Sequence, residues 1–182
     1  MVDLNALTAA NAKRCLTQDA LKEILKYDPE TGLFYWLVTR GRHARPGKLA
    51  GTPHKVKRSK SAYWRIKINS RYYLAHRLAF LYMTGTWPIN QPDHKNTDTL
   101  DNRWDNLRDA TPSQNQANRA ARKDNKTGFK GVYFDTTSGK YRAEIQVNKK
   151  QIGLGYFENP EAASAAYAMA AHQYFGEFAR VA

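Results

Sequence analysis

The sequence predicts an α+β protein with two small cores, each formed by short strands and one or more helices. Aromatic residues are frequent, with 11 Tyr, 7 Phe and 4 Trp in 182 residues, and many of them stand in short alternating runs that are typical of half-buried strands. Helix start and stop signals separate these runs. A chain of this length is sufficient for one ordinary domain or two small ones.

In the first half of the chain, the sequence predicts a short helix, several strands and a second helix. Thr17 can cap the first helix, whose apolar residues share one face. The strand candidates are residues 33–38, 63–68 and 71–74, the last two joined by a turn at Asn69-Ser70. The second helix is predicted from about His76 to Thr84, where Gly85 ends it. Residues 89–110 are predicted to be irregular or strand-like.

A capped helix and a linker are predicted next. Thr-Pro-Ser-Gln at 111–114 is a helix start with Thr as the cap, Pro at the first position and Gln at the third. This helix is predicted to extend to about Arg122. The composition shifts at residues 123–128, which we interpret as a linker between a first domain over 1–122 and a second over 129–182.

In the last part of the chain, the sequence predicts three strands and one long helix. The strands are expected near residues 129–134, 140–147 and 151–157. Asn159-Pro160-Glu161 caps a helix that ends near Phe175. Its small Ala residues would let this helix lie close on the three-stranded sheet.

Basic residues are concentrated in one segment. The chain has 29 Lys and Arg against 16 Asp and Glu, a formal net charge of +13, and between Glu30 and Asp93 there are 12 basic residues and no acidic residue. A segment without carboxylates tolerates its self-repulsion best against a polyanion, which predicts nucleic acid as the partner. An anionic membrane is the weaker alternative, because no amphipathic basic helix is present. The candidate contacts are Lys55, Lys57, Arg58, Lys60, Arg65 and Lys67.

Several other protein classes do not fit the composition. No stretch approaches the roughly 20 apolar residues that a membrane helix needs, and residues 1–5 show no secretory signal. Cys15 is the one cysteine, which excludes an internal disulfide framework and a Cys-x-x-Cys zinc cluster. We therefore expect a soluble, cytoplasmic protein without a membrane partner. The sequence does not indicate an oligomeric state.

Four polar residues after the basic segment suit phosphodiester hydrolysis. Asp93 and His94 are expected in a loop, Asn106 opens a short strand, and Asn115 lies in the first turn of the next helix. A hairpin of this length can bring the four side chains into one pocket. Carboxylate and amide oxygens suit a hard divalent cation, and a His with an ordinary pKa of about 6.5 can accept a proton from water. A polar loop of turn-forming residues is the alternative, which the spacing and the adjoining charge disfavour.

Four segments carry a family resemblance: His-Arg-Leu-Ala-Phe at 76–80, Asp-His-Lys-Asn at 93–96, Leu-Asp-Asn-Arg-Trp-Asp-Asn-Leu-Arg at 100–108 and Thr-Pro-Ser-Gln-Asn at 111–115. They resemble the HNH homing endonucleases of bacteriophages over roughly residues 17–120. This resemblance implies a ββα-metal hairpin that binds one divalent ion and cleaves or nicks DNA in the host-cell cytoplasm.

The resemblance also implies roles for individual residues. Asp93 and Asn115 would be the metal ligands, His94 the general base and Asn106 the central Asn. Mg²⁺ is the expected ion and Mn²⁺ the alternative. Many family members have His where Asn115 stands, and this departure leaves the preferred metal open. The candidates for supporting the site are His76, Asn102 and Asn118. For His76, a structural role at a strand-to-helix junction is the first interpretation, and a contact with phosphate or with the site is the alternative.

The last third of the chain resembles a second family. Gly-Phe-Lys-Gly-Val-Tyr at 128–133, Gly-Lys-Tyr-Arg-Ala-Glu-Ile at 139–145 and Leu-Gly-Tyr-Phe at 154–157 resemble the Apetala/ethylene-response DNA-binding domain. That resemblance implies a three-stranded sheet that lies in the major groove of double-stranded DNA, with one helix behind it. Alternation along residues 140–147 exposes a polar face that could contact base edges, although an ordinary solvated face is the alternative. The candidate contacts are Lys130, Tyr133, Lys140, Arg142, Glu144 and Gln146.

Together these features predict a metal-dependent DNA endonuclease with an appended recognition domain. The main alternative is a non-catalytic DNA-binding or regulatory protein that keeps a degenerate HNH hairpin. A degenerate copy should have lost at least one of the four site residues, and all four are present. An RNA-binding factor would fit the charge but would leave these four residues unexplained.

Overall fold

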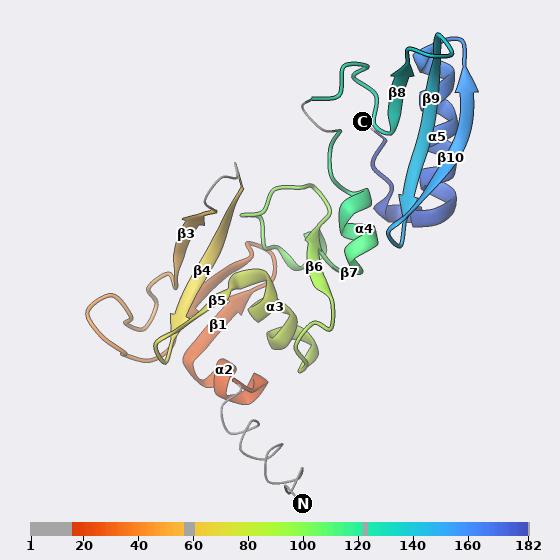
Figure 1. Ribbon diagram of the computed structural model, residues 1–182. Helices are drawn as coiled ribbons and strands as arrows, with labels where there is room; N and C mark the ends of the chain where they lie inside the picture. The colour runs from red at the N-terminus through yellow and green to blue at the C-terminus, as the bar shows by residue number, and fades with distance from the viewer. Residues whose placement is uncertain (1–15, 57–60, 122–123, 182) are drawn as a thin grey trace, which may run out of the picture. The chain divides into compact units, whose positions relative to one another are not determined.

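The computed structural model describes residues 16–56, 61–121 and 124–181. These residues form a mixed α/β structure with four α-helices and small antiparallel sheets (Figure 1), so the α+β class predicted from the sequence is confirmed at this level. None of the described helices is long and apolar enough to cross a membrane.

The described residues divide into two compact units. The first runs to His94 and includes Asp98–Leu107, and the second contains Lys95–Thr97 and continues from Arg108. The division at residues 107 and 108 lies earlier than the predicted domain boundary, because residues near 110 and 117 belong to the buried cluster of the second unit. The two predicted domains and their linker stay a prediction, and residue 123 of that linker lies outside the described residues.

The first unit begins with α2 (Gln18–Ile24), β1 (Leu25–Asp28) and β2 (Leu33–Trp36). As predicted, Thr17 caps the helix, its hydroxyl accepting from the backbone N–H of Ala20 at 3.3 Å. Strands β1 and β2 form an antiparallel hairpin. In its turn Gly32 has φ +73°, and a Cβ at this position would lie 2.3 Å from the carbonyl carbon of Asn102. A glycine is required here, because the hairpin turn packs directly on the backbone of the Asn102 loop.

The next elements are β3 (Thr52–Lys55), β4 (Ala62–Ile68), β5 (Arg71–Leu74) and α3 (Ala75–Thr84), with the strands in the order β3-β4-β5. Asn69 and Ser70 both have positive φ and make the predicted two-residue turn. Ile66 and Ile68 are buried in the same cluster as α3, and Lys67 between them is exposed, as alternation predicts. Strand β3 was not predicted, because its four residues are all exposed and carry no apolar pattern.

The hairpin region contains β6 (Gln91–His94), a 3₁₀ turn η1 (Trp104–Asn106), β7 (Leu107–Ala110) and α4 (Pro112–Ala117), with β6 paired to β7. Helix α4 starts with the predicted capping box but ends at Ala117 instead of near residue 122. The ammonium of Lys130 donates to the carbonyl of Ala117, and the backbone N–H of Asn118 closes the last turn. A tertiary contact therefore accompanies the end of a helix for which the sequence shows no stop signal.

The second unit continues with β8 (Val132–Asp135), β9 (Lys140–Val147), β10 (Lys150–Phe157), α5 (Pro160–Phe175) and a 3₁₀ turn η2 (Gly176–Phe178). The antiparallel sheet has the order β10-β9-β8, and α5 covers one face (Figure 1). Ala143 and Ile145 of β9 are buried on that face, as the alternation predicts. In α5, Tyr167 and Phe175 are buried with several of the Ala residues, whereas Tyr174 is exposed.

Candidate active site

His94 is held by an amide side chain that fixes the position of its proton. His94 ends β6 and is 4% exposed, and its Nε2 lies 3.2 Å from Oδ1 of Asn102. The amide nitrogen of Asn102 donates to the carbonyl of Leu100 at 3.1 Å, so its oxygen faces the ring. An amide oxygen only accepts hydrogen bonds. Nε2 therefore carries the proton, and Nδ1 is the basic nitrogen of the neutral ring.

The loop that carries Asn102 is fastened from several sides. The hydroxyl of Tyr27 donates to the carbonyl of Asn102 at 2.6 Å, and Gly32 packs on the same backbone. Asn106 is buried, and its Nδ2 donates to the carbonyl of Asp101 at 2.7 Å. This hydrogen bond lies within the loop that follows β6. The buried contacts restrict the motion of the amide that faces His94.

A second histidine packs against the first. His76, in the first turn of α3, is 5% exposed, and its ring centroid lies 5.2 Å from that of His94 at an interplanar angle of 90°. Tyr63 of β4 lies 5.6 Å from His76 and 6.4 Å from His94. Of the two interpretations of His76, the structure shows a contact with the site residue His94. Tyr63 was not among the predicted site residues, because no local pattern links a strand tyrosine to histidines further along the chain.

Both imidazoles are held in their neutral form. Burial, followed by the charges of His94 and Arg77, lowers the pKa of His76 to about 3. Burial also lowers the pKa of His94 below the usual 6.5, against the opposing effects of the Asn102 hydrogen bond and the Asp93 charge. At neutral pH His94 is therefore uncharged and able to accept a proton.

The two predicted metal ligands are placed on different elements. Asp93 is buried and, like His94, belongs to strand β6 instead of the expected loop, because β6 pairs with β7. Asn115 is half-buried in α4, which belongs to the second unit. Among the described residues, no group of three or more His, Cys, Asp or Glu is placed to hold a metal. The predicted pair supplies a carboxylate and an amide oxygen, a donor set that fits a hard ion such as Mg²⁺, which keeps several waters.

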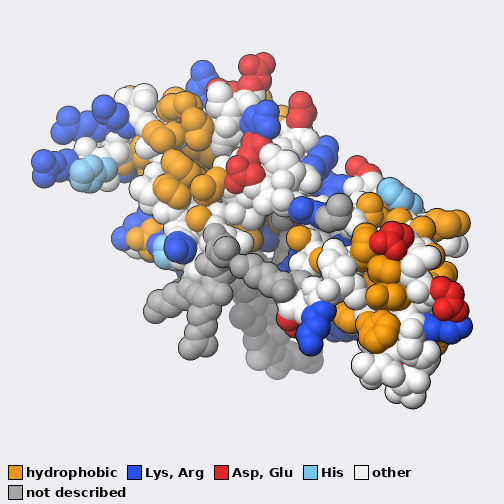
Figure 2. Space-filling model, turned by 90° about the horizontal axis from the view of Figure 1, so that it is seen from above, with side chains coloured by type: hydrophobic (Ala, Val, Ile, Leu, Met, Phe, Trp, Pro, Cys, Tyr) orange, Lys and Arg blue, Asp and Glu red, His pale blue; other side chains and the backbone are white. Residues whose placement is uncertain are grey.

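Two basic residues of β4 lie on the same face as Tyr63, the residue that contacts both histidines. Arg65 and Lys67 alternate with the buried side of β4 and lie on the same side as Tyr63. The Arg65 guanidinium lies 3.9 Å from the ring centroid of Tyr72, and the Lys67 ammonium lies 5.6 Å from it. Lys55 is exposed on β3. Three further predicted contacts lie outside the described residues, namely Lys57, Arg58 and Lys60. Figure 2 shows Lys and Arg side chains gathered with His beside them at one end of the visible face.

The predicted contacts of the second unit make bonds within that unit. Arg142 pairs with Glu144 at 3.0 Å and Lys140 with Glu158 at 2.6 Å. Nε2 of Gln116 donates to Oε1 of Gln146 at 2.6 Å. Tyr133 is exposed on β8, and Asn118 is buried at the end of α4.

Lys130 makes the most interior contacts of these predicted residues. Its ammonium donates to the carbonyls of Ala117 and Arg180, and burial together with the charge of Arg180 lowers its pKa to about 8. These bonds join the end of α4 and the carboxy-terminal segment to the start of the sheet. They give Lys130 a structural role, and its predicted DNA contact stays a prediction.

Comparison with protein families finds that residues 73–117 match a model described as HNH endonuclease. The matched segment includes His76, Asp93, His94, Asn106 and Asn115. Neither the curated proteins nor the solved structures yield a match. The family match supports an HNH nuclease, and with it a nucleic-acid substrate.

Proposed function

We propose that this protein is a metal-dependent DNA endonuclease, of the homing type that bacteriophages encode, in which His94 is the general base. The observation that carries the proposal is the Asn102 hydrogen bond to a buried, neutral His94. A general base must be unprotonated at the working pH and must present its lone pair in a fixed direction. Burial keeps the ring unprotonated, and the bond from Nε2 to Asn102 fixes the ring so that Nδ1 is the nitrogen that accepts the proton.

The proposed reaction is hydrolysis of a phosphodiester. Nδ1 of His94 takes a proton from a water molecule while the water oxygen attacks phosphorus, and the bond from phosphorus to one ester oxygen breaks. The imidazolium that forms is stabilised by Asn102 and by the charge of Asp93, which both favour the protonated ring. Asn106 acts as a positioning residue, because it holds the carbonyl of Asp101 next to Asn102 in the same loop.

Asp93 and Asn115 are the residues that would hold one divalent ion, Mg²⁺ first and Mn²⁺ as the alternative. Their oxygens are the ligand type that such ions prefer. When bound, the ion would stabilise negative charge on the phosphate and on the leaving oxygen. The buried carboxylate of Asp93 precedes the base directly in the chain, which supports a shared site.

Double-stranded DNA is the proposed substrate, bound at the carboxylate-free segment of the first unit. Arg65 and Lys67 support this assignment, because both lie over the ring of Tyr72 and on the face of β4 that carries Tyr63. Tyr63 in turn contacts the rings of His76 and His94. A DNA backbone that lies along this face of β4 would therefore bring a phosphate close to His94.

The test is incubation of supercoiled plasmid with the purified chain, with Mg²⁺ or with chelator. The wild type should nick or linearise the plasmid only with the metal. His94→Ala should lower the rate by at least about 10²-fold and leave affinity for DNA nearly unchanged, whereas His172→Ala, an exposed histidine of α5, should cleave normally. A wild-type protein that binds the plasmid tightly but leaves it intact with every divalent ion would favour the non-catalytic alternative.

A further inference from the structure

The outward face of the carboxy-terminal sheet carries a row of side chains that the nuclease chemistry does not use. Tyr133 of β8 and Tyr156 of β10 are the cross-strand partners of Arg142 in β9, so the three side chains lie side by side on one face. The tyrosines are 43% and 55% exposed. This face therefore presents two accessible rings on either side of a strand that carries a cation.

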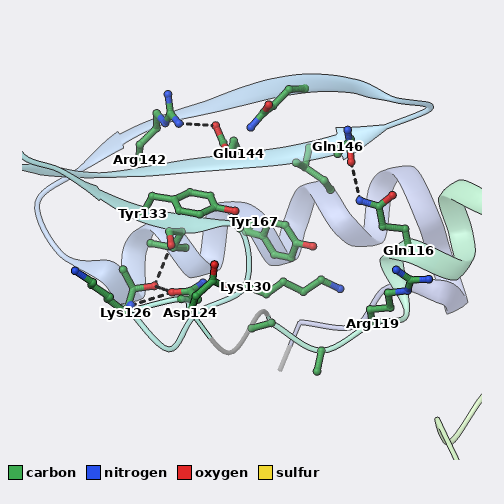
Figure 3. Close-up of a pocket in the computed structure, with 18 of the residues that line it drawn as sticks. Gln116, Arg119, Asp124, Lys126, Lys130, Tyr133, Arg142, Glu144, Gln146 and Tyr167 are labelled. Atoms are coloured by element: carbon green, nitrogen blue, oxygen red, sulfur yellow. Dashed lines mark hydrogen bonds and ion pairs between the residues drawn. The ribbon is translucent and has the colours of Figure 1, made fainter. Parts of the chain in front are cut away.

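A cleft adjoins this row. Its volume is about 920 Å³, and both the sheet and the segment between α4 and β8 line it. Figure 3 shows Arg142, Glu144 and Gln146 along the strands on one side, and Arg119 and Lys126 on the other. The cleft is therefore a concave space with polar strand residues on one side and two cationic groups on the other.

The polar side chains of this face are already engaged. Glu144 is 12% exposed at its side chain and pairs with Arg142, and Gln146 accepts a hydrogen bond from Gln116. Reading base pairs in a major groove requires donors and acceptors that project to base edges. Glu144 and the amide oxygen of Gln146 are thus engaged within the protein, and the exposed rings of Tyr133 and Tyr156 lie on the same sheet.

We propose that this face and its cleft bind unpaired DNA, with bases stacked on Tyr133 and Tyr156 and phosphates near Arg119 and Lys126. Ring faces of bases are hidden inside a duplex and accessible in a single strand, and every base can stack on an aromatic side chain. Arg142 adds a planar cation on which a base can also stack. The proposal does not depend on the nuclease chemistry of the first unit.

The test measures binding of the full chain carrying His94→Ala, in chelator, to a labelled thymidine oligonucleotide of about 12 nucleotides. A salt concentration of about 200 mM suppresses the phosphate-driven binding of the basic segment. The oligonucleotide should bind tighter than an abasic strand of equal length and tighter than the matching duplex. Tyr133→Ala and Tyr156→Ala should each weaken binding about 5- to 100-fold.

Two control variants separate stacking from other roles of these residues. Tyr133→Phe keeps the ring and should bind like the parent chain. Tyr174→Ala removes a ring of similar exposure, 46%, on α5 and should also bind like the parent. Photo-crosslinking of an iodouracil-substituted strand should modify the peptides that contain Tyr133 or Tyr156. Equal affinity for thymidine and abasic strands, preference for the duplex, or crosslinks confined to the first unit would overturn the proposal.

Discussion

The two units treat their positive charges in opposite ways. In the second unit, Arg142 and Lys140 are paired with carboxylates of the same unit. In the first unit, Arg65 and Lys67 come from a segment without a single carboxylate and lie on an aromatic ring instead. Binding of DNA by cations that are neutralised within the protein releases few counterions, whereas cations without acidic partners remain available to attract a polyanion. The units should therefore bind DNA by different forces, the first electrostatically and the second by stacking.

Both units also bury a basic group, again with different consequences. His76 in the first unit has a pKa lowered to about 3 by burial, and Lys130 in the second has a pKa lowered to about 8. The histidine contacts the proposed general base, whereas the lysine joins backbone carbonyls. Partial or full burial thus lowers the pKa of both groups, although only His76 contacts the proposed general base.

The largest expected effect concerns the Asn102 amide that contacts His94. Asn102→Ala should lower the rate of plasmid cleavage about 10²- to 10³-fold, because Nε2 loses the partner that fixes the proton and the ring. Affinity for DNA should change little. Asn102→Asp should retain more activity but move the rising limb of the pH–rate profile to higher pH, because a carboxylate raises the pKa of His94. An unchanged profile in both variants would mean that Asn102 does not act through His94.

The second prediction separates the units by their response to acid. The folded pKa of His76 is about 3 and the unfolded value is about 6.5, so the unfolded chain binds the additional proton first. The contribution of His76 to stability is therefore complete above pH 6.5 and falls by about 1.4 kcal/mol per pH unit between pH 6.5 and 3. Lys130 adds no slope there, because its window lies between pH 8 and its ordinary value of 10.5.

The measurement is chemical denaturation at several pH values, followed by tryptophan fluorescence. The four tryptophans all lie in the first unit, at positions 36, 64, 87 and 104. Hydrogen exchange in α5 reports the second unit separately. His76→Phe keeps an aromatic ring. It should reduce the slope of the unfolding free energy against pH, for the first unit, by the contribution of about one bound proton. Equal acid sensitivity of both units would contradict this assignment.

The third prediction compares the salt dependence of the two surfaces. Replacing Arg65 and Lys67 together by Gln should reduce the slope of log affinity against log salt, by about 0.9 for each phosphate contact that is lost. Replacing Arg142 and Lys140 together by Gln should leave that slope nearly unchanged, because both cations are paired within the unit. Fluorescence anisotropy with one duplex at several salt concentrations checks both. A steeper loss from the second pair would reverse the comparison.

The smallest expected effect tests where the units divide. Thr111 caps α4, and Thr111→Ala should cost about 1 kcal/mol. Because Ala110 and Ala117 pack in the second unit's buried cluster, the loss should appear in the exchange of α5 amides and leave the tryptophan transition of the first unit unchanged. A shift of the tryptophan transition alone would assign α4 to the first unit instead.

Local features were predictable from the sequence because they depend on neighbouring residues. The cap at Thr17, the turn at Asn69-Ser70 and the capping box of α4 are each set by residues within one turn of chain. The alternation of β9 likewise assigned Ala143 and Ile145 to the buried face. Order along the chain also brought Asp93, His94, Asn106 and Asn115 together as candidates, and the family match covers all four.

The tertiary structure decided what distant residues do to one another. The sequence named Asn102 only as one of three candidates for supporting the site, and the structure shows that its amide is the one that faces His94. Tyr27 and Gly32 hold its loop from a hairpin some seventy residues earlier. The end of α4 and the pairing of Gln146 with Gln116 likewise depend on contacts that no local pattern records. Propensity and periodicity act between near neighbours, whereas burial and hydrogen bonding act between whichever residues the fold brings together.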